Sequence, residues 1–293
     1  MQDAILVTVI CSCYNHAEFV TESIQSVLNQ SHKNIQLIVV DDCSNDNSVS
    51  VIENFIVDYP EITFIKNKTN LGLTKSVTNA MRYAKGEYFI DLAADDILSP
   101  NCIEIQLNTF KNSSYNNLAI VYGNAELITE DGKHSSYYFE VDGNLKTKTK
   151  RPSGAIYSNV ISAETTICSV SSMCKKAIFD KLNGYDTTLS YEDLDFWIRV
   201  SRDYNIEFID AILIQKRILP NSLLTTLYTK KNENSYSTYL ILKKAFQLNK
   251  TKKEHQTLSK RVNFEILNSY RTSNYLLMLK NMHLRLLIGL KSL

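Results

Sequence analysis

Two kinds of hydrophobic spacing alternate along the first hundred residues. Four short stretches are apolar almost throughout, which is typical of strands buried on both faces of a sheet. These stretches are Ile5–Cys13, Ile35–Val40, Ile62–Ile65 and Tyr88–Leu92. Between them, apolar residues recur every three or four positions, as in helices that bury one face. The alternation predicts an α/β fold with a mainly parallel sheet and helices on its faces.

The predicted helices have start and stop signals of their own. Asn15 is a residue type that caps helices, and Glu18 follows it by three positions, so we expect a helix to begin there. Gly86 follows the third apolar stripe, where a glycine in the left-handed conformation often ends a helix.

The pattern is looser beyond the first hundred residues. The expected segments are a helix over Ile103–Phe110, a strand over Ala119–Tyr122, a polar stretch over 132–150, a helix over 175–183 ended by Gly184, and a helix over Glu192–Arg202. From about Tyr236 the apolar spacing is that of helices alone.

Charge divides the chain unevenly. The net charge is +1, but residues 1–227 carry 19 Lys and Arg against 28 Asp and Glu, whereas residues 228–293 carry 13 against 3. We therefore expect an acidic body over 1–227 and a basic helical tail over 228–293.

Composition is that of a soluble globular enzyme, with 44% hydrophobic and 22% charged residues. The apolar start is too short for a signal peptide, and no run of about 20 apolar residues follows, so we expect a cytoplasmic protein. The six cysteines lack the paired spacing of a zinc site and are expected to be free thiols. They are Cys11, Cys13, Cys43, Cys102, Cys168 and Cys174.

The end of the tail, Tyr275–Leu293, combines leucines with Lys and Arg. Such a helix can lie on an anionic membrane surface, which would make the protein peripheral on the inner face of the plasma membrane. It can equally pack on the enzyme's own body or in a homodimer, and the charge favours the membrane slightly. Aromatic and basic residues do not interleave there, so nucleic acid is not an expected partner.

Paired acids stand at two of the predicted strand ends, where ligands bind in sheets of this kind. Asp41 could accept a hydrogen bond from the N–H of a uracil or thymine ring. Asp42 is more simply explained as the cap of the helix that starts near residues 44–47. Asp95 and Asp96 offer the hard oxygen ligands that Mg²⁺ or Mn²⁺ prefers. Alternatively, both pairs are only turn and helix-start residues.

These and other segments resemble family 2 glycosyltransferases, which have the GT-A fold. The matching pieces are VTVICSCYNHAEFVTESIQSVLNQ, IQLIVVDDCSND, NLGLTKS, GEYFIDLAADDILSP, LNGYDTTLSYEDLDFWIRV and RILPNS. They occur in the family's order across roughly residues 5–225. The resemblance implies a Rossmann-like αβα sandwich with a nucleotide-binding half over 1–100 and an acceptor-binding half over 101–227.

The resemblance also implies a reaction. A sugar moves with inversion from a nucleotide donor, expected to be UDP-linked, to a hydroxyl of a glycan or polyprenyl-diphosphate-linked acceptor, in the synthesis of a surface polysaccharide or lipopolysaccharide. A divalent ion, Mn²⁺ or Mg²⁺, neutralises the leaving diphosphate.

Residue roles follow by matching motifs. The residues implied in nucleotide binding are Tyr14, Asn15, Asp41, Asp42, Asp95 and Arg217, and those implied in metal binding are Asp95 and Asp96. Asp193 is the implied general base, with Glu192 as the other candidate, because inversion requires a base on the side of the attacking hydroxyl. Acids also favour helix starts for electrostatic reasons alone. Trp197 is expected to support this helix, and all five histidines are expected at the surface.

Three departures from the family pattern leave alternatives open. Ala93 replaces the first acid of Asp-x-Asp-Asp, Leu219 replaces a histidine, and Lys75–Thr78 lacks a common Arg-Asn. One alternative is a non-catalytic sugar-nucleotide-binding partner subunit. Another is a different nucleotide-using α/β enzyme, such as a nucleotidyltransferase or a dehydrogenase, although no Gly-x-Gly-x-x-Gly follows the first strand.

Overall fold

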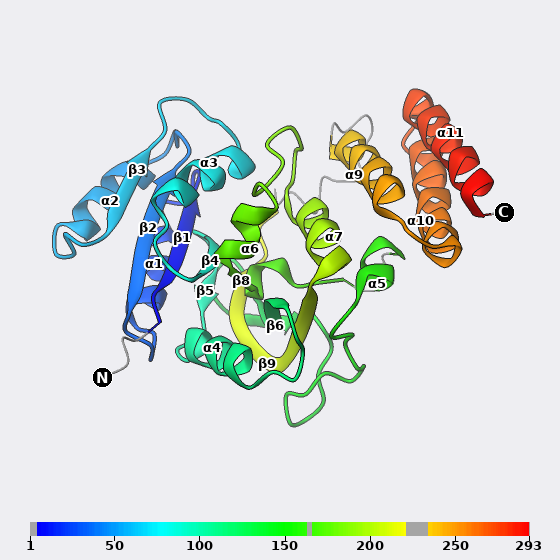
Figure 1. Cartoon of the computed structure of the whole chain (residues 1–293). Coiled ribbons are helices and arrows are strands. Elements are labelled where there is room, and N and C mark those ends of the chain that lie inside the picture. Colours follow the sequence, from blue (N-terminus) through cyan, green and yellow to red (C-terminus); the bar gives the residue numbers. More distant parts are fainter. Residues whose placement is uncertain (1–4, 163–165, 221–233, 293) are drawn as a thin grey trace. The chain divides into compact units, whose positions relative to one another are not determined.

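The computed structural model describes residues 5–162, 166–220 and 234–292 (Figure 1). They form two compact units, each assembled from separate stretches of chain. The sheet unit comprises Met1–Gly154, Ile167–Gly184 and Asn205–Ile218, and the helical unit comprises Ala155–Thr166, Tyr185–Tyr204 and Leu219–Leu293. The expected boundary after residue 227 lies outside the described residues.

Four parallel strands form the first half of the sheet. They are β1 (Val7–Cys13), β2 (Ile35–Asp41), β3 (Thr63–Lys66) and β4 (Tyr88–Ala93), in the order β3-β2-β1-β4. The four predicted strands are thereby confirmed, with ends that shift by one or two residues. Cys13 pairs with Asp41, and Ser12 pairs with Ala93, so the carboxyl ends of β1, β2 and β4 meet at one edge.

The second half of the sheet is mixed. Beyond β4 come β8 (Met173–Lys175), β6 (Leu118–Ile128), β9 (Asn205–Arg217) and β5 (Ile97–Leu98), and β7 (His134–Tyr137) pairs with β6. β6 and β9 run parallel, whereas β8 is antiparallel to both of its neighbours. β5 follows Asp95-Asp96 directly and pairs with β9, which brings the end of β9 beside these acids.

Helices flank the sheet. They are α1 (Val20–Leu28), α2 (Ser48–Ile56), α3 (Leu73–Ala80), the 3₁₀ turn η1 (Met81–Tyr83), α4 (Cys102–Asn112) and α6 (Lys176–Lys181). The predicted stop after α6 is confirmed, because Gly184 has a φ of 66° and its N–H donates to the carbonyl of Phe179.

Two predicted helix signals are wrong. Asn15 does not cap α1, which begins at Val20; its own φ is 57° and its side chain accepts a hydrogen bond from the N–H of Asn45. Gly86 is not in the left-handed conformation. A Cβ there would lie 2.5 Å from the backbone nitrogen of Thr8, so glycine is required by the close approach of β1.

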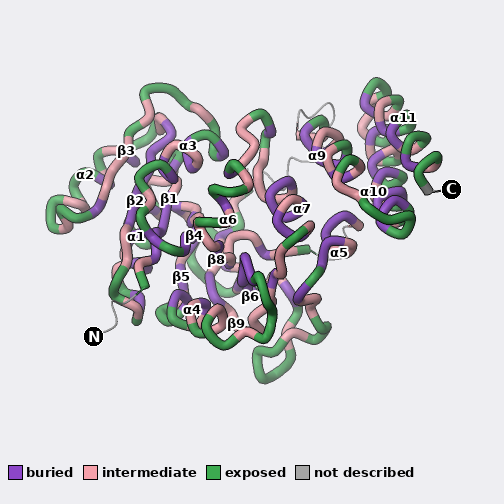
Figure 2. The backbone as a smooth tube through the Cα atoms, viewed as in Figure 1, coloured by how far each residue is buried: buried purple, intermediate pink, exposed green. Residues whose placement is uncertain are grey.

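The helical unit contains α5 (Tyr157–Ser162), α7 (Asp193–Asp203), α9 (Asn234–Leu248), α10 (Lys252–Arg271) and α11 (Tyr275–Ser292). The helices expected from about Tyr236 onward are thus confirmed over residues 234–292. α11 packs on α10 and α9 and buries Leu277, Leu284 and Ile288, while its other face is exposed (Figure 2). In the described ranges no helix is long and apolar enough to cross a membrane.

Buried cysteines and Trp197 also match expectation. All six cysteines are free thiols, and all but Cys43 are buried. Trp197 is 5% exposed on α7, as expected for a residue that supports the helix. The expectation that all histidines lie at the surface is wrong for His255, which lies on α10 and is 7% exposed.

Candidate active site

The joined ends of β1, β2 and β4 carry three of the predicted site residues. Tyr14 follows β1 and is 41% exposed, Asp41 is the last residue of β2, and Asp95 lies two positions beyond β4. The parallel register, rather than any closeness in sequence, brings them to one edge. This is the edge at which α/β sheets bind ligands.

The loop after β1 is fixed by polar groups at the start of α2. The backbone N–H of Asn15 donates to Ser44 Oγ at 2.9 Å, and that of His16 donates to Ser48 Oγ at 3.0 Å. The N–H of Ala17 donates to Asp46 Oδ2 at 3.0 Å. The loop that would face a nucleotide is therefore held in one conformation by its neighbour.

Asp41 is held in a tight turn. Its carboxylate accepts hydrogen bonds from the backbone N–H of Ser44 at 2.9 Å and from the Ser44 hydroxyl at 2.5 Å. The residue is 1% exposed, so a nucleobase reaches it only when the atoms above it move aside. A carboxylate accepts about four hydrogen bonds, which leaves capacity for a base N–H.

Asp42 organises a different loop from the one expected. Its carboxylate accepts from the Asn67 amide and from the backbone N–H groups of Leu71 and Gly72, at 2.8–2.9 Å. The prediction that Asp42 caps the next helix is wrong. The cap position of α2 is Asn47, and the nearby carboxylate of Asp46 accepts from the N–H of Ser48, the first residue of the helix.

Asp95 is the carboxylate that remains partly open. Its side chain is 16% exposed, and one of its oxygens, Oδ1, lies 3.7 Å from His16 Nδ1. Its backbone carbonyl accepts a hydrogen bond from Arg217 Nε at 3.2 Å. Arg217 thus holds the backbone at Asp95, while the carboxylate stays partly exposed.

Asp96 faces the interior instead. It is fully buried, and its Oδ1 accepts a hydrogen bond from the backbone N–H of Arg217 at 3.0 Å. Its Oδ2 accepts none and has Lys216 Nζ 4.0 Å away. Burial raises the pKa of this carboxyl to about 7, against the opposing effect of the Lys216 ammonium. A carboxylate so enclosed is not open to an ion at the strand ends.

Arg217 braces this region. Its guanidinium donates to the carbonyls of Thr129 and Glu130 and pairs with Glu22 at 2.7 Å. It also lies over the ring of Phe19 at 4.6 Å, and its side chain is 3% exposed. The contact with phosphates implied for Arg217 stays a prediction, one that requires the Glu22 pair to open.

The two candidate bases belong to the helical unit. Glu192 occupies the cap position of α7, and Asp193 is its first residue, with Oδ1 accepting from the N–H of Leu194. Both are half-buried. Their predicted place at the start of a helix is confirmed, while their part in catalysis stays a prediction.

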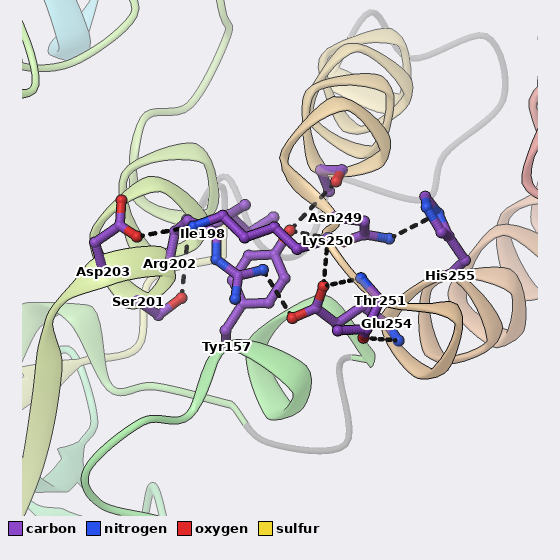
Figure 3. A network of polar contacts seen from close by, with 11 residues as sticks. Tyr157, Ile198, Ser201, Arg202, Asp203, Asn249, Lys250, Thr251, Glu254 and His255 are labelled. Carbon is purple, nitrogen blue, oxygen red and sulfur yellow. Dashed lines mark hydrogen bonds and ion pairs between the residues drawn. The ribbon is translucent and has the colours of Figure 1, made fainter. Parts of the chain in front are cut away.

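The far end of α7 is anchored to the tail helices (Figure 3). Arg202 pairs with Glu254 at 2.8 Å and lies over the ring of Tyr157, which itself bonds to Asn249. Glu254 closes a capping box with Thr251 at the start of α10. The tail therefore packs as part of the unit that carries Asp193.

A second set of ion pairs joins α7 to α9. Asp195 is 1% exposed and is paired with Arg199 at 2.7 Å and with Lys244 at 2.8 Å. Lys244 also pairs with Asp186. Burial alone would raise the pKa of Asp186, but hydrogen bonds from Lys244 and Thr188 outweigh it and lower the pKa to about 2.

Comparison with known proteins decides the family. The model of glycosyl transferase family 2 matches residues 8–182. The chain belongs to glycosyltransferase family 2. An uncharacterized glycosyltransferase of Rickettsia felis is 31% identical over 214 residues, which are 72% of this chain and 34% of that protein. The chain thus spans about a third of that relative's length.

Solved structures show the same fold. TarS of S. aureus in complex with UDP-GlcNAc matches with a TM-score of 0.69 at 16% identity, over 91% of this chain and 75% of that one. The mannosyltransferase PcManGT of Pyrobaculum calidifontis, in complex with GDP-Man and Mn²⁺, matches with a TM-score of 0.63 at 14% identity, over 94% and 73%. The glycosyltransferase therefore has the predicted GT-A fold.

A divalent ion at the strand-end edge would be bound by protein carboxylate and substrate phosphate together. Within the described residues, no three His, Cys, Asp or Glu side chains are grouped to hold a metal. Mg²⁺ is commonly bound by only one or two carboxylates together with substrate phosphates and water. The open carboxylate of Asp95 suits such a site, and the buried Asp96 does not.

Sequence reasoning missed two residues at this edge. His16 was expected at the surface but faces Asp95, and Glu22 pairs with Arg217 from 195 positions away. The position of His16 directly after Tyr14-Asn15 was the only signal for the first. The pairing of Glu22 had none.

Proposed function

We propose that this glycosyltransferase moves a sugar, with inversion, from a UDP-linked donor to a hydroxyl of a glycan or polyprenyl-diphosphate-linked acceptor. The observation that carries the proposal is the gathering of Tyr14, Asp41 and Asp95 at the joined ends of three parallel strands. The structural neighbours named above are complexes with nucleotide sugars, which supports a donor of that class.

Each residue of this edge has a proposed part. The ring of Tyr14 stacks on the base, because an aromatic face that is 41% exposed is available for such contact. Asp41 accepts a hydrogen bond from the base. Asn15 and Asp42 contribute by fixing the two loops that flank the nucleotide.

Asp95 is proposed to hold Mn²⁺ or Mg²⁺. When bound, such an ion neutralises the negative charge of the leaving diphosphate. Arg217 keeps Asp95 in place through its backbone carbonyl. Asp96 supports the same turn from the interior, and so we leave it out of the metal ligands.

Asp193 is proposed as the general base for the acceptor hydroxyl, with Glu192 as the other candidate. Support comes from the matching Glu-Asp pair and from its place at the start of α7. The family model ends at residue 182, so it does not itself cover this pair. Asp193 takes the proton of the acceptor hydroxyl as the hydroxyl oxygen attacks the sugar and the nucleoside diphosphate leaves.

The Asp193→Asn variant tests this assignment. It keeps the shape and the hydrogen bond to the N–H of Leu194 but removes the basic oxygen. We expect kcat to fall by about 10²–10⁴-fold with donor affinity nearly unchanged. Glu192→Gln tests the other candidate in the same way, and a larger fall in kcat there would move the role to Glu192. An equal fall in donor affinity would show that Asp193 holds the donor, and an unaltered kcat would remove it from the chemistry.

The proposed setting is the synthesis of a surface polysaccharide or lipopolysaccharide at the cytoplasmic face of a membrane. Support comes from α11, where Leu276, Leu279, Leu286 and Leu290 are each 58–70% exposed. Basic residues outnumber acidic ones by 13 to 3 over 228–293. This combination suits adsorption to an anionic lipid surface, where a lipid-linked acceptor would lie.

A non-catalytic sugar-nucleotide-binding subunit is the second candidate. Ala93 and the burial of Asp96 favour it, because they leave Asp95 as the one open acid of the motif. Binding of a nucleotide sugar without turnover would distinguish it from an enzyme.

A further inference from the structure

His16 stands beside the proposed metal ligand with an unsatisfied nitrogen. Its Nδ1 lies 3.7 Å from Asp95 Oδ1, which is longer than a hydrogen bond. This nitrogen is shielded from solvent and has no hydrogen-bond partner. Leaving a shielded polar atom without a hydrogen bond is unfavourable, and so a bound group that satisfies it would be stabilised.

The separation of the two atoms suits one shared ion. Ligand bonds to small divalent ions are about 2.0–2.1 Å long for both imidazole nitrogen and carboxylate oxygen. Two atoms 3.7 Å apart can therefore both contact one ion placed between them. Neither side chain is sealed, since 24% of His16 and 16% of Asp95 remain exposed.

The backbone at both residues is held by neighbouring groups, and the imidazole of His16 also lies against the ring of Phe19. The His16 N–H donates to Ser48 Oγ, and its carbonyl accepts from the N–H groups of Phe19 and Val20. The ring of Phe19 meets the imidazole edge-on. The Arg217 guanidinium lies over that same Phe19 ring and donates to the carbonyl of Asp95. The backbones that carry the two side chains are thus held in place without a ligand.

We infer that His16 would be a second protein ligand of the divalent ion, acting through Nδ1 together with Asp95. The inference rests on the proposed function, in which Asp95 holds that ion. An imidazole added to an oxygen site raises affinity for Mn²⁺ and later transition metals more than for Mg²⁺. The site therefore selects Mn²⁺ over Mg²⁺.

Pulsed electron paramagnetic resonance of Mn²⁺ bound with UDP tests the bond directly. The wild type should show hyperfine coupling to a directly bound imidazole nitrogen, and His16→Ala should lack it. His16→Phe keeps a ring against Phe19 and should also lack it. His283→Ala, which removes an exposed histidine of α11, should retain the coupling. Thermal unfolding confirms that each variant is folded.

Titration with Mn²⁺ and Mg²⁺ in the presence of UDP gives a second measurement. Both His16 variants should weaken Mn²⁺ binding at least about tenfold, the scale seen when a metal site loses a supporting group. Mg²⁺ binding should change less. UDP affinity without metal should stay the same in both variants. If His16 contacted phosphate instead of the ion, its replacement would lower that affinity.

The outcomes separate this inference from the proposed function. If Asp95→Ala abolishes Mn²⁺ binding while both His16 variants keep the nitrogen coupling and the Mn²⁺ affinity, the inference is wrong and the metal site at Asp95 stands. If the His16 variants lose only metal-free UDP affinity, the imidazole contacts phosphate and the inference is again wrong. If Asp95→Ala binds Mn²⁺ normally, the proposed metal site itself fails.

Discussion

Polar groups are used differently in the two units of the glycosyltransferase. In the sheet unit, Tyr14 and Asp95 stay partly exposed near the ends of strands. The backbone beside them is held by hydrogen bonds with neighbouring segments. In the helical unit, Asp195 and Glu254 are buried between helices and are satisfied by cations of the same unit. Polar residues that leave one side open can bind a ligand, whereas polar residues satisfied on every side hold helices together.

This difference predicts two kinds of variant. Substitutions at the strand-end edge should change ligand binding or turnover while the free energy of unfolding stays nearly constant. Substitutions in the paired interior of the helical unit should lower the free energy of unfolding first. If variants of both kinds changed ligand binding and the free energy of unfolding alike, the two units would not use polar groups differently.

The largest effect is expected from Asp95→Ala. Metal-dependent turnover should be abolished, because no second open carboxylate of the motif is available to hold the ion. The melting temperature should change little, since a partly exposed acid contributes little to the core. Asp131→Ala, an exposed acid of the same unit, is the control. Full activity in Asp95→Ala, or in the wild type with excess chelator, would contradict the metal assignment.

Lys244→Met should have the largest effect on stability. It removes a cation from Asp195, which is 1% exposed and keeps only Arg199. Breaking a fully buried pair costs about 3–5 kcal/mol; we expect about 2 kcal/mol, because Lys244 is a third exposed.

Denaturant unfolding measures the effect of Lys244→Met, and the exposed neighbour Lys243→Met is the matched control. UDP affinity should not change. Equal stability of the two variants would show that the ion pairs between α7 and α9 contribute nothing measurable.

Asp41 lies at the strand-end edge, like Asp95, but is buried to 1% exposure, like Asp195, and Asp41→Ala probes this combination. It should weaken UDP binding by about 1.5–3 kcal/mol, the scale of a hydrogen bond to a charged group. Ser44→Ala separates the two roles of Asp41, because it removes the hydroxyl that bonds to Asp41 and to the N–H of Asn15 but keeps the carboxylate. Calorimetry with free UDP gives the dissociation constants. An unchanged constant together with a lower melting temperature would make Asp41 a turn residue only.

The smallest effect is expected at the surface of α11. Replacing Leu286 and Leu290 by Gln should weaken sedimentation with anionic vesicles by about tenfold, because burial of each leucine contributes on the order of 1.5–3 kcal/mol when complete. Point substitutions are the cleaner test, since deleting α11 would expose the face of α10 that it covers. Leu145→Gln in the sheet unit, 50% exposed, is the control. Unchanged sedimentation would assign this face of α11 to a protein contact.

Much of the sheet unit follows from the sequence, because its signals are local. Buried parallel strands are continuous apolar runs in the sequence, and the acids stand at the last residue of β2 and two residues beyond β4. Wrong predictions arose where a partner is distant in sequence. Asp42 resembles a helix cap, but its partners lie 25–30 residues on.

The helical unit was predictable only in its helices. The two ion pairs of Lys244, with Asp195 and with Asp186, join residues 49 and 58 positions apart, and no spacing signals such contacts. The change in charge after residue 227 also gave no indication that residues 185–204 pack with the tail. Composition reports the average of a segment, whereas packing depends on which faces meet.

Turnover of a panel of nucleotide sugars distinguishes a metal-dependent glycosyltransferase from a sugar-nucleotide-binding subunit. Purified protein is incubated with each donor and Mn²⁺ or Mg²⁺, and released UDP is measured beside UDP binding. We predict cation-dependent release from at least one UDP-sugar, abolished in Asp95→Ala and strongly reduced in Asp193→Asn. Tight binding of UDP with no release from any donor would contradict the account and make this chain a sugar-nucleotide-binding subunit.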